Sequence, residues 1–121
     1  MAKSILTVDD SKTIRDMVSF TLKGAGYAVH EAPDGAAGLA AAGRQKFDCI
    51  ITDLNMPGMD GLALTRAIRS GTANRATPVL LLTTEADPAK KAAGREAGAT
   101  GWLVKPFNPD KLIETVRKVC P

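Results

Sequence analysis

The sequence is poor in aromatic residues, in cysteine and in long apolar runs. Phenylalanine, tryptophan and tyrosine make up 4% of the 121 residues, which leaves few rings on which nucleic-acid bases could stack. Only two cysteines are present, and Cys49 and Cys120 lack the spacing of a metal or redox motif, so we expect free thiols. The apolar stretches fall far short of the ~18 residues of a membrane span, and the N-terminus shows no signal-peptide pattern. We therefore expect a cytoplasmic protein that does not enter a membrane.

A strong excess of charge of one sign is also lacking. Sixteen basic and 13 acidic side chains give a net charge of +3, and they are scattered apart from a small cluster at Lys90, Lys91 and Arg95. A basic run that could follow a phosphate backbone is missing, so we expect no nucleic-acid partner. The length and the 45% of hydrophobic residues are typical of one globular domain, which we expect to span residues 1–121.

Short apolar runs alternate with longer amphipathic stretches along the whole chain. The predicted strands are Ser4 to Val8, Ala28 to Ala32, Cys49 to Thr52, Pro78 to Thr83 and Gly101 to Val104. The predicted helices cover residues 12–24, 35–43, 60–70, 87–97 and 109–119. Because crossover helices of this length connect parallel strands, the pattern predicts a doubly wound α/β fold with five parallel strands and five helices.

Polar residues follow the apolar runs, at the sheet edge where α/β proteins bind ligands. They are Asp9 and Asp10, then Asp53, Thr83 and Lys105. Taken singly, each has a structural interpretation: a helix-start acid pair, a loop acid, a strand threonine and an exposed lysine. Three carboxylates at one edge repel one another unless a cation such as Mg²⁺ neutralises them, and an ammonium with a hydroxyl suits an incoming phosphoryl group. Their common position favours the functional interpretation.

Four segments carry a resemblance to a known family. They are Val8-Asp9-Asp10-Ser11, Asp53-Leu54-Asn55-Met56-Pro57-Gly58-Met59-Asp60-Gly61, Leu82-Thr83-Thr84-Glu85-Ala86 and Lys105-Pro106-Phe107. Together they resemble the response-regulator receiver domain of two-component systems, most closely its single-domain chemotaxis regulators. The resemblance covers essentially the whole chain. It implies a flavodoxin-like strand order of 2-1-3-4-5.

The resemblance also assigns roles to the residues at the strand ends. Asp53 would be the nucleophile that accepts a phosphoryl group from the phosphohistidine of a histidine kinase of the chemotaxis type. Asp10 and Asp53 would hold Mg²⁺ together with the main-chain carbonyl of Asn55, and Asp9 would act largely through a coordinated water. Lys105 would pair with a phosphoryl oxygen. Such chemistry needs little beyond in-line positioning and neutralisation of charge.

The resemblance further implies a switch. Thr83 would move to bond the phosphoryl group, and the aromatic residue three positions before Lys105, here Trp102, would follow it inward. The tryptophan is larger than the tyrosine usual in the chemotaxis regulators. More volume would have to move inward, so the inward state would be less populated and the switch weaker. The interpretation that needs no switch is that Trp102 is an ordinary packing residue.

We expect a monomeric signalling module, not an enzyme with a separate substrate, although it would promote its own phosphorylation and dephosphorylation. No stretch for an effector domain follows the last predicted helix, so output would be contact with a flagellar motor-switch protein through the fourth helix, fifth strand and fifth helix. Lys91 stands where the family's chemotaxis pattern has an apolar residue. A phosphate sink or phosphorelay shuttle is therefore the alternative, and an enzyme on the same fold is the third possibility.

The lifetime of the acyl phosphate would depend on Asn55 and Glu85, two positions past Asp53 and Thr83. Both match the chemotaxis pattern and imply fast hydrolysis, but Thr84 replaces the smaller residue common beside the switch threonine. Because its bulk would hinder water, we predict that Thr84→Ala hydrolyses its phosphate faster. The decay rate of phosphorylated protein tests this, and an unchanged or slower decay would contradict it.

Overall fold

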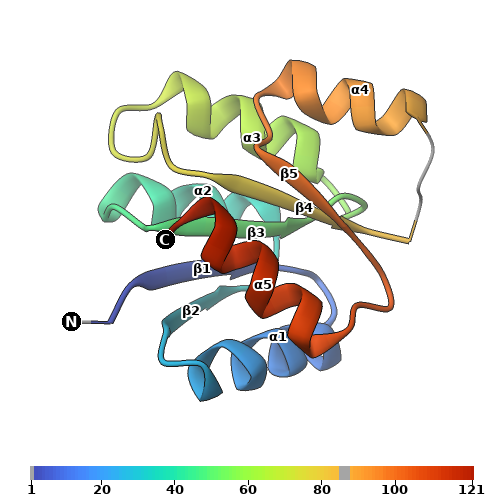
Figure 1. Ribbon diagram of the computed structural model, residues 1–121. Helices are drawn as coiled ribbons and strands as arrows, with labels where there is room; N and C mark the ends of the chain where they lie inside the picture. Colours follow the sequence, from blue (N-terminus) through green and yellow to red (C-terminus); the bar gives the residue numbers. More distant parts are fainter. Residues whose placement is uncertain (1, 85–87) are drawn as a thin grey trace.

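The computed structural model describes residues 2–84 and 88–121 as a parallel sheet with helices on both faces (Figure 1). The strands are β1 (Ser4–Val8), β2 (Ala28–Ala32), β3 (Cys49–Asp53), β4 (Val79–Thr83) and β5 (Gly101–Val104). The helices are α1 (Lys12–Gly24), α2 (Gly35–Arg44), α3 (Gly61–Ser70), α4 (Pro88–Ala97) and α5 (Pro109–Val119). The five strands pair in the order β2-β1-β3-β4-β5, which confirms the predicted fold.

Element bounds differ from the predictions by at most one residue. β4 begins at Val79 and not at Pro78 as predicted. β3 continues through Asp53, which pairs in register with Leu82 of β4. α3 begins one residue later than predicted because Asp60 is its N-cap and accepts a hydrogen bond from the Ala63 amide at 2.8 Å. α2 extends to Arg44. Residue 87, predicted to begin the fourth helix, lies outside the described residues.

Alternate strand residues form two apolar cores, one on each face of the sheet. Ile5, Leu80 and Leu82 pack with side chains of α1 and α5 in one core. The neighbouring strand residues Leu6 and Val79 pack with side chains of α2 and α3 in the other. The central strands β3 and β4 are buried throughout, as expected for parallel strands covered on both faces. No helix within the described part of the chain is long and apolar enough to cross a membrane.

A buried asparagine holds together three segments at the sheet edge where β3 begins. The Asn74 side-chain amide donates to the carbonyls of Ala42 and Gln45 at 2.6 and 2.8 Å. Its oxygen accepts from the Phe47 amide at 2.8 Å and from the Thr77 hydroxyl at 2.9 Å. Asn74 is only 3% exposed, so these groups depend on its side chain for their hydrogen bonds and cannot turn to solvent instead.

We predict that Asn74→Ala lowers the free energy of unfolding by about 3 kcal/mol, because it leaves buried donors and acceptors without partners. Urea denaturation measures the change. Thr72→Ala, at an exposed position of the same loop, is the matched control and should change stability by less than about 0.5 kcal/mol. Equal stability of the two variants would contradict the role given to Asn74.

Candidate functional site

Three carboxylates meet at the edge of the sheet where β1 and β3 end. Asp9 and Asp10 follow β1, and Asp53 is the last residue of β3. One oxygen from each lies within 4.8 Å of the others. Asp9 and Asp53 are buried, whereas Asp10 is exposed. The structure thus brings together the acidic residues that the sequence predicted would meet.

Lys105 extends from the end of β5 into this acidic cluster. Its Nζ lies 3.1 Å from Asp53 Oδ1 and 3.3 Å from Asp9 Oδ2, and its side chain is 14% exposed. The Lys105 amide also donates to the Thr83 carbonyl at 2.6 Å, which joins the ends of β4 and β5. The Lys105–Pro106 peptide bond is cis. One partly buried ammonium therefore bridges two of the three carboxylates.

The cluster holds more negative charge than Lys105 neutralises. Burial raises the pKa of Asp53 above its ordinary value of 3.8, and the charges of Asp9 and Asp10 raise it further. The hydrogen bond and the positive charge of Lys105 lower the pKa, but they do not reverse the shift. Ionised Asp53 is thus less favourable here than in water.

The donor set fits a hard divalent cation. Carboxylate oxygens are the ligands that Mg²⁺ prefers, and exposed Asp10 leaves one side of the cluster open to the waters that Mg²⁺ retains. A divalent cation would also offset the burial and the carboxylate repulsion that raise the pKa of Asp53. Asn55, whose carbonyl was predicted as a further ligand, is an exposed loop residue two positions after Asp53.

Two residues that the sequence did not single out position these acids. The Arg15 guanidinium donates to the Asp9 main-chain carbonyl at 2.6 Å and pairs with Glu31 at 3.4 Å. Gly61 begins α3 so close to β3 that an added Cβ would clash with the Asp53 carbonyl oxygen. Arg15 gives no sequence signal because its partner is a backbone atom. Gly61 stands in the quoted Asp60-Gly61 pair, which was a signal.

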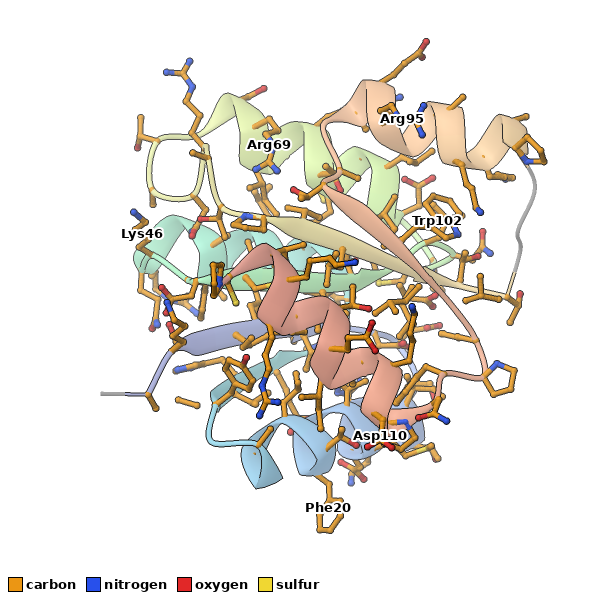
Figure 2. All side chains as sticks on the ribbon, viewed as in Figure 1. Phe20, Lys46, Arg69, Arg95, Trp102 and Asp110 are labelled. Carbon is orange, nitrogen blue, oxygen red and sulfur yellow. The ribbon has the colours of Figure 1, made fainter. Side chains whose placement is uncertain are left out.

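The predicted switch residues lie on β4 and β5, the neighbouring strands. Thr83 is fully buried at the end of β4, opposite Val104 in the β5 register. Trp102 is half-buried on β5 and lies beneath α4 (Figure 2). Within the described residues its indole nitrogen is buried without a hydrogen-bond partner. Thr84 is exposed, and Glu85 lies outside the described residues.

Gly94 of α4 makes room for the Trp102 ring. A Cβ at Gly94 would lie 2.9 Å from ring atom Cζ3 of Trp102 and 2.8 Å from a Leu81 methyl carbon. A single missing methyl group thus lets the large ring pack against the helix. No pattern in the sequence indicates that these two residues are in contact.

Similarity to known proteins identifies the family to which the chain belongs. Residues 5–117 match the model of the response regulator receiver domain. The chain belongs to this family. It is 38% identical to chemotaxis protein CheY of Pseudomonas aeruginosa over 95% of this chain and 94% of that one. It also matches longer proteins, a transcriptional regulatory protein of Bacillus subtilis and a DNA-binding response regulator of Mycolicibacterium paratuberculosis, and it spans about half the length of each.

Solved receiver domains share the fold closely. Chemotaxis protein CheY4 of Vibrio cholerae superposes with a TM-score of 0.95 at 50% identity, over 98% of this chain and 99% of that one. The receiver domain of sensor histidine kinase PA1611 from Pseudomonas aeruginosa has a TM-score of 0.92 at 29% identity, over 99% and 98% of the two chains. That structure carries a magnesium ion coordinated in its active site cleft.

The raised pKa of Asp53 predicts a stability effect in metal-free protein. A carboxyl whose pKa is higher in the folded state destabilises the fold when it ionises, and this cost is lost as the pH falls through the raised pKa. We predict that Asp53→Asn, with a chelator present, unfolds a few degrees higher at pH 7, and that the gain shrinks in acid.

Thermal unfolding at several pH values measures this effect. Asp16→Asn is the matched control, because it removes one carboxylate from an exposed pair with Lys12 and should change little. A midpoint for Asp53→Asn at or below that of the wild type at pH 7 would show that attraction to Lys105 outweighs burial and repulsion.

Proposed function

We propose that this chain is a cytoplasmic response regulator in which Asp53 accepts a phosphoryl group from a histidine kinase. Asp9, Asp10, Asp53 and the main-chain carbonyl of Asn55 would hold Mg²⁺. The observation that supports this most strongly is the buried contact of Asp53 with Lys105 inside a cluster of carboxylates. The magnesium ion in the PA1611 receiver domain supports the choice of metal.

The residues at this edge suit phosphoryl transfer. An Asp53 oxygen attacks the phosphorus atom, the bond from phosphorus to the histidine nitrogen breaks, and the leaving imidazole retains its electron pair and takes up a proton. Lys105 Nζ, 3.1 Å from Asp53 Oδ1, is placed to donate to a phosphoryl oxygen. Bound Mg²⁺ supplies the remaining positive charge that the phosphoryl oxygens require. The module carries the phosphoryl group on its own side chain and has no separate substrate.

Thr83 and Trp102 would convert the phosphoryl group into a signal. Thr83 is buried beside the Lys105 backbone, so a shift of its hydroxyl toward a new anion would disturb the β4–β5 edge. Trp102 lies two residues before Val104, the β5 residue that pairs with Thr83. Its inward movement would vacate the space above Gly94 and change the α4 surface. Coupling of ~1–3 kcal/mol is typical of such switches.

The output surface would be formed by α4, β5 and α5 and would bind a flagellar motor-switch protein. The similarity to CheY and CheY4 over nearly their whole lengths supports this assignment. A cavity of about 270 Å³ beside Trp102 is lined by Lys91 and Arg95 and lies on this surface. We propose that the chain acts as a monomer and that this contact is its output.

A phosphate sink or phosphorelay shuttle is the second candidate. Lys91 is exposed on α4 where the chemotaxis pattern has an apolar residue, so a motor protein that needs an apolar contact there would bind poorly. The site chemistry would be the same. Only the contact that follows phosphorylation separates the two candidates.

Binding to the N-terminal peptide of a flagellar motor-switch protein separates these functions. With Mg²⁺ and a beryllium fluoride phosphoryl mimic, we expect affinity to rise about 5- to 150-fold, the range of a 1–3 kcal/mol coupling. Trp102 fluorescence reports the binding. Asp53→Asn should show no rise, because the mimic has no carboxylate to join.

Phosphoryl uptake from a small acyl phosphate is measured in the same samples. Uptake without peptide binding in either state would favour the sink or relay. Lys91→Ile should then restore some binding if the exposed charge is what prevents it. Absence of uptake would contradict both candidates.

A further inference from the structure

The two cysteines lie together at the sheet edge opposite the phosphorylation site. Cys49 is the first residue of β3, and Cys120 directly follows α5. Both belong to the apolar core that α1 and α5 cover, and the C-terminus lies beside the start of β3 (Figure 1). Asp53 is four residues further along β3, about 13 Å away at the usual rise per residue. The pair is therefore separate from the acidic cluster.

The thiols of Cys49 and Cys120 interact and differ in character. Both side chains lie in one core cluster, and each is the largest influence on the pKa of the other: Cys120 raises the pKa of Cys49, and Cys49 lowers that of Cys120. The positive charge of Lys3 also favours the Cys120 thiolate, although burial and the charge of Asp48 oppose it. Cys49 is completely buried within its strand, so Cys120 is the sulfur that ionises more readily.

Both cysteines are buried, but Cys120 lies beside a cavity and Cys49 is not among the residues that line it. A cavity of about 500 Å³ is lined by Cys120 and includes Lys3, Tyr27 and Arg117 in its wall. Cys120 retains 8% of its surface exposed, whereas Cys49 has none. The positive charge of Lys3 at this cavity suits an anionic sulfur, and a small polar oxidant such as hydrogen peroxide fits within it.

We propose that Cys120 is a peroxide-reactive thiol and that Cys49 is its resolving partner. The Cys120 thiolate attacks one peroxide oxygen, the O–O bond breaks, and sulfenic acid and hydroxide form. The Cys49 sulfur then attacks the Cys120 sulfur, the S–O bond breaks, and a disulfide and water result. Overall, two thiols are oxidised, one hydrogen peroxide is reduced, and two waters form.

This disulfide would join the start of β3 to the end of α5. α5 is part of the proposed output surface, so oxidation would restrain one of its elements at its last turn. The link lies far from Asp53, so phosphoryl uptake should continue in the oxidised protein. The thiol chemistry does not depend on the proposed signalling function.

Intact-mass measurement tests the pair directly. Hydrogen peroxide is added to reduced protein, with glutathione in the same tube as an internal reference. We expect a monomer that has lost two hydrogen atoms and both titratable thiols, and that recovers both on reduction. In Cys49→Ala, Cys120 should persist as a sulfenic acid that dimedone captures. In Cys120→Ala, Cys49 should stay reduced.

Far-ultraviolet circular dichroism of each variant verifies that it is folded, whether or not the protein takes up a phosphoryl group. The proposal is overturned if both thiols survive peroxide that oxidises the glutathione, or if the product is a dimer linked through Cys120. Oxidation of Cys49 in folded Cys120→Ala would also overturn it, because Cys49 would then be the reactive sulfur.

Discussion

The site depends on one electrostatic imbalance: within the described residues, three clustered carboxylates face one partly buried ammonium, which contacts two of them. Lys105 contacts Asp53 and Asp9, yet burial and repulsion still raise the pKa of Asp53. Such a cluster costs folding free energy unless further positive charge enters it. A divalent cation would supply that charge, and the excess acceptor oxygens would provide its ligands. In our interpretation the destabilised carboxylate is the nucleophile, so the same arrangement that weakens the fold locally prepares it for phosphoryl transfer.

The rest of the fold fixes the geometry of this imbalance. Parallel strands place Asp53 and the residues after β1 at one edge, and the two apolar cores hold those strands rigidly. Gly61 lets α3 begin against the Asp53 carbonyl, and Arg15 holds the Asp9 carbonyl. The link from Lys105 to Thr83 then joins the site to β5 and Trp102. The acidic cluster is thereby connected to the surface around β5 and Trp102, which is the proposed output surface.

The sequence predicted the strands and the acidic cluster well, because buried parallel strands are apolar runs and polar residues follow them abruptly. Beyond this cluster, it could not predict which side chains come into contact across the fold. The packing of Trp102 over Gly94 depends on an absent methyl group. Cys49 and Cys120 are far apart in sequence and lack a motif spacing, so nothing indicated that β3 and α5 would bring them into one core. Asn74 lies in a loop whose composition gives no structural signal, yet its side chain makes hydrogen bonds to three backbone groups and one side-chain group.

Locating the phosphoryl group tests the central claim most directly. The protein is incubated with Mg²⁺ and a small acyl phosphate, and the mass of its peptides is measured. We expect a single added phosphoryl group on the peptide that carries Asp53, no addition in Asp53→Asn, and strongly reduced addition when the metal is chelated. A phosphoryl group on another residue, or equal labelling without a divalent cation, would contradict the role that we assign to Asp53 and its acidic neighbours.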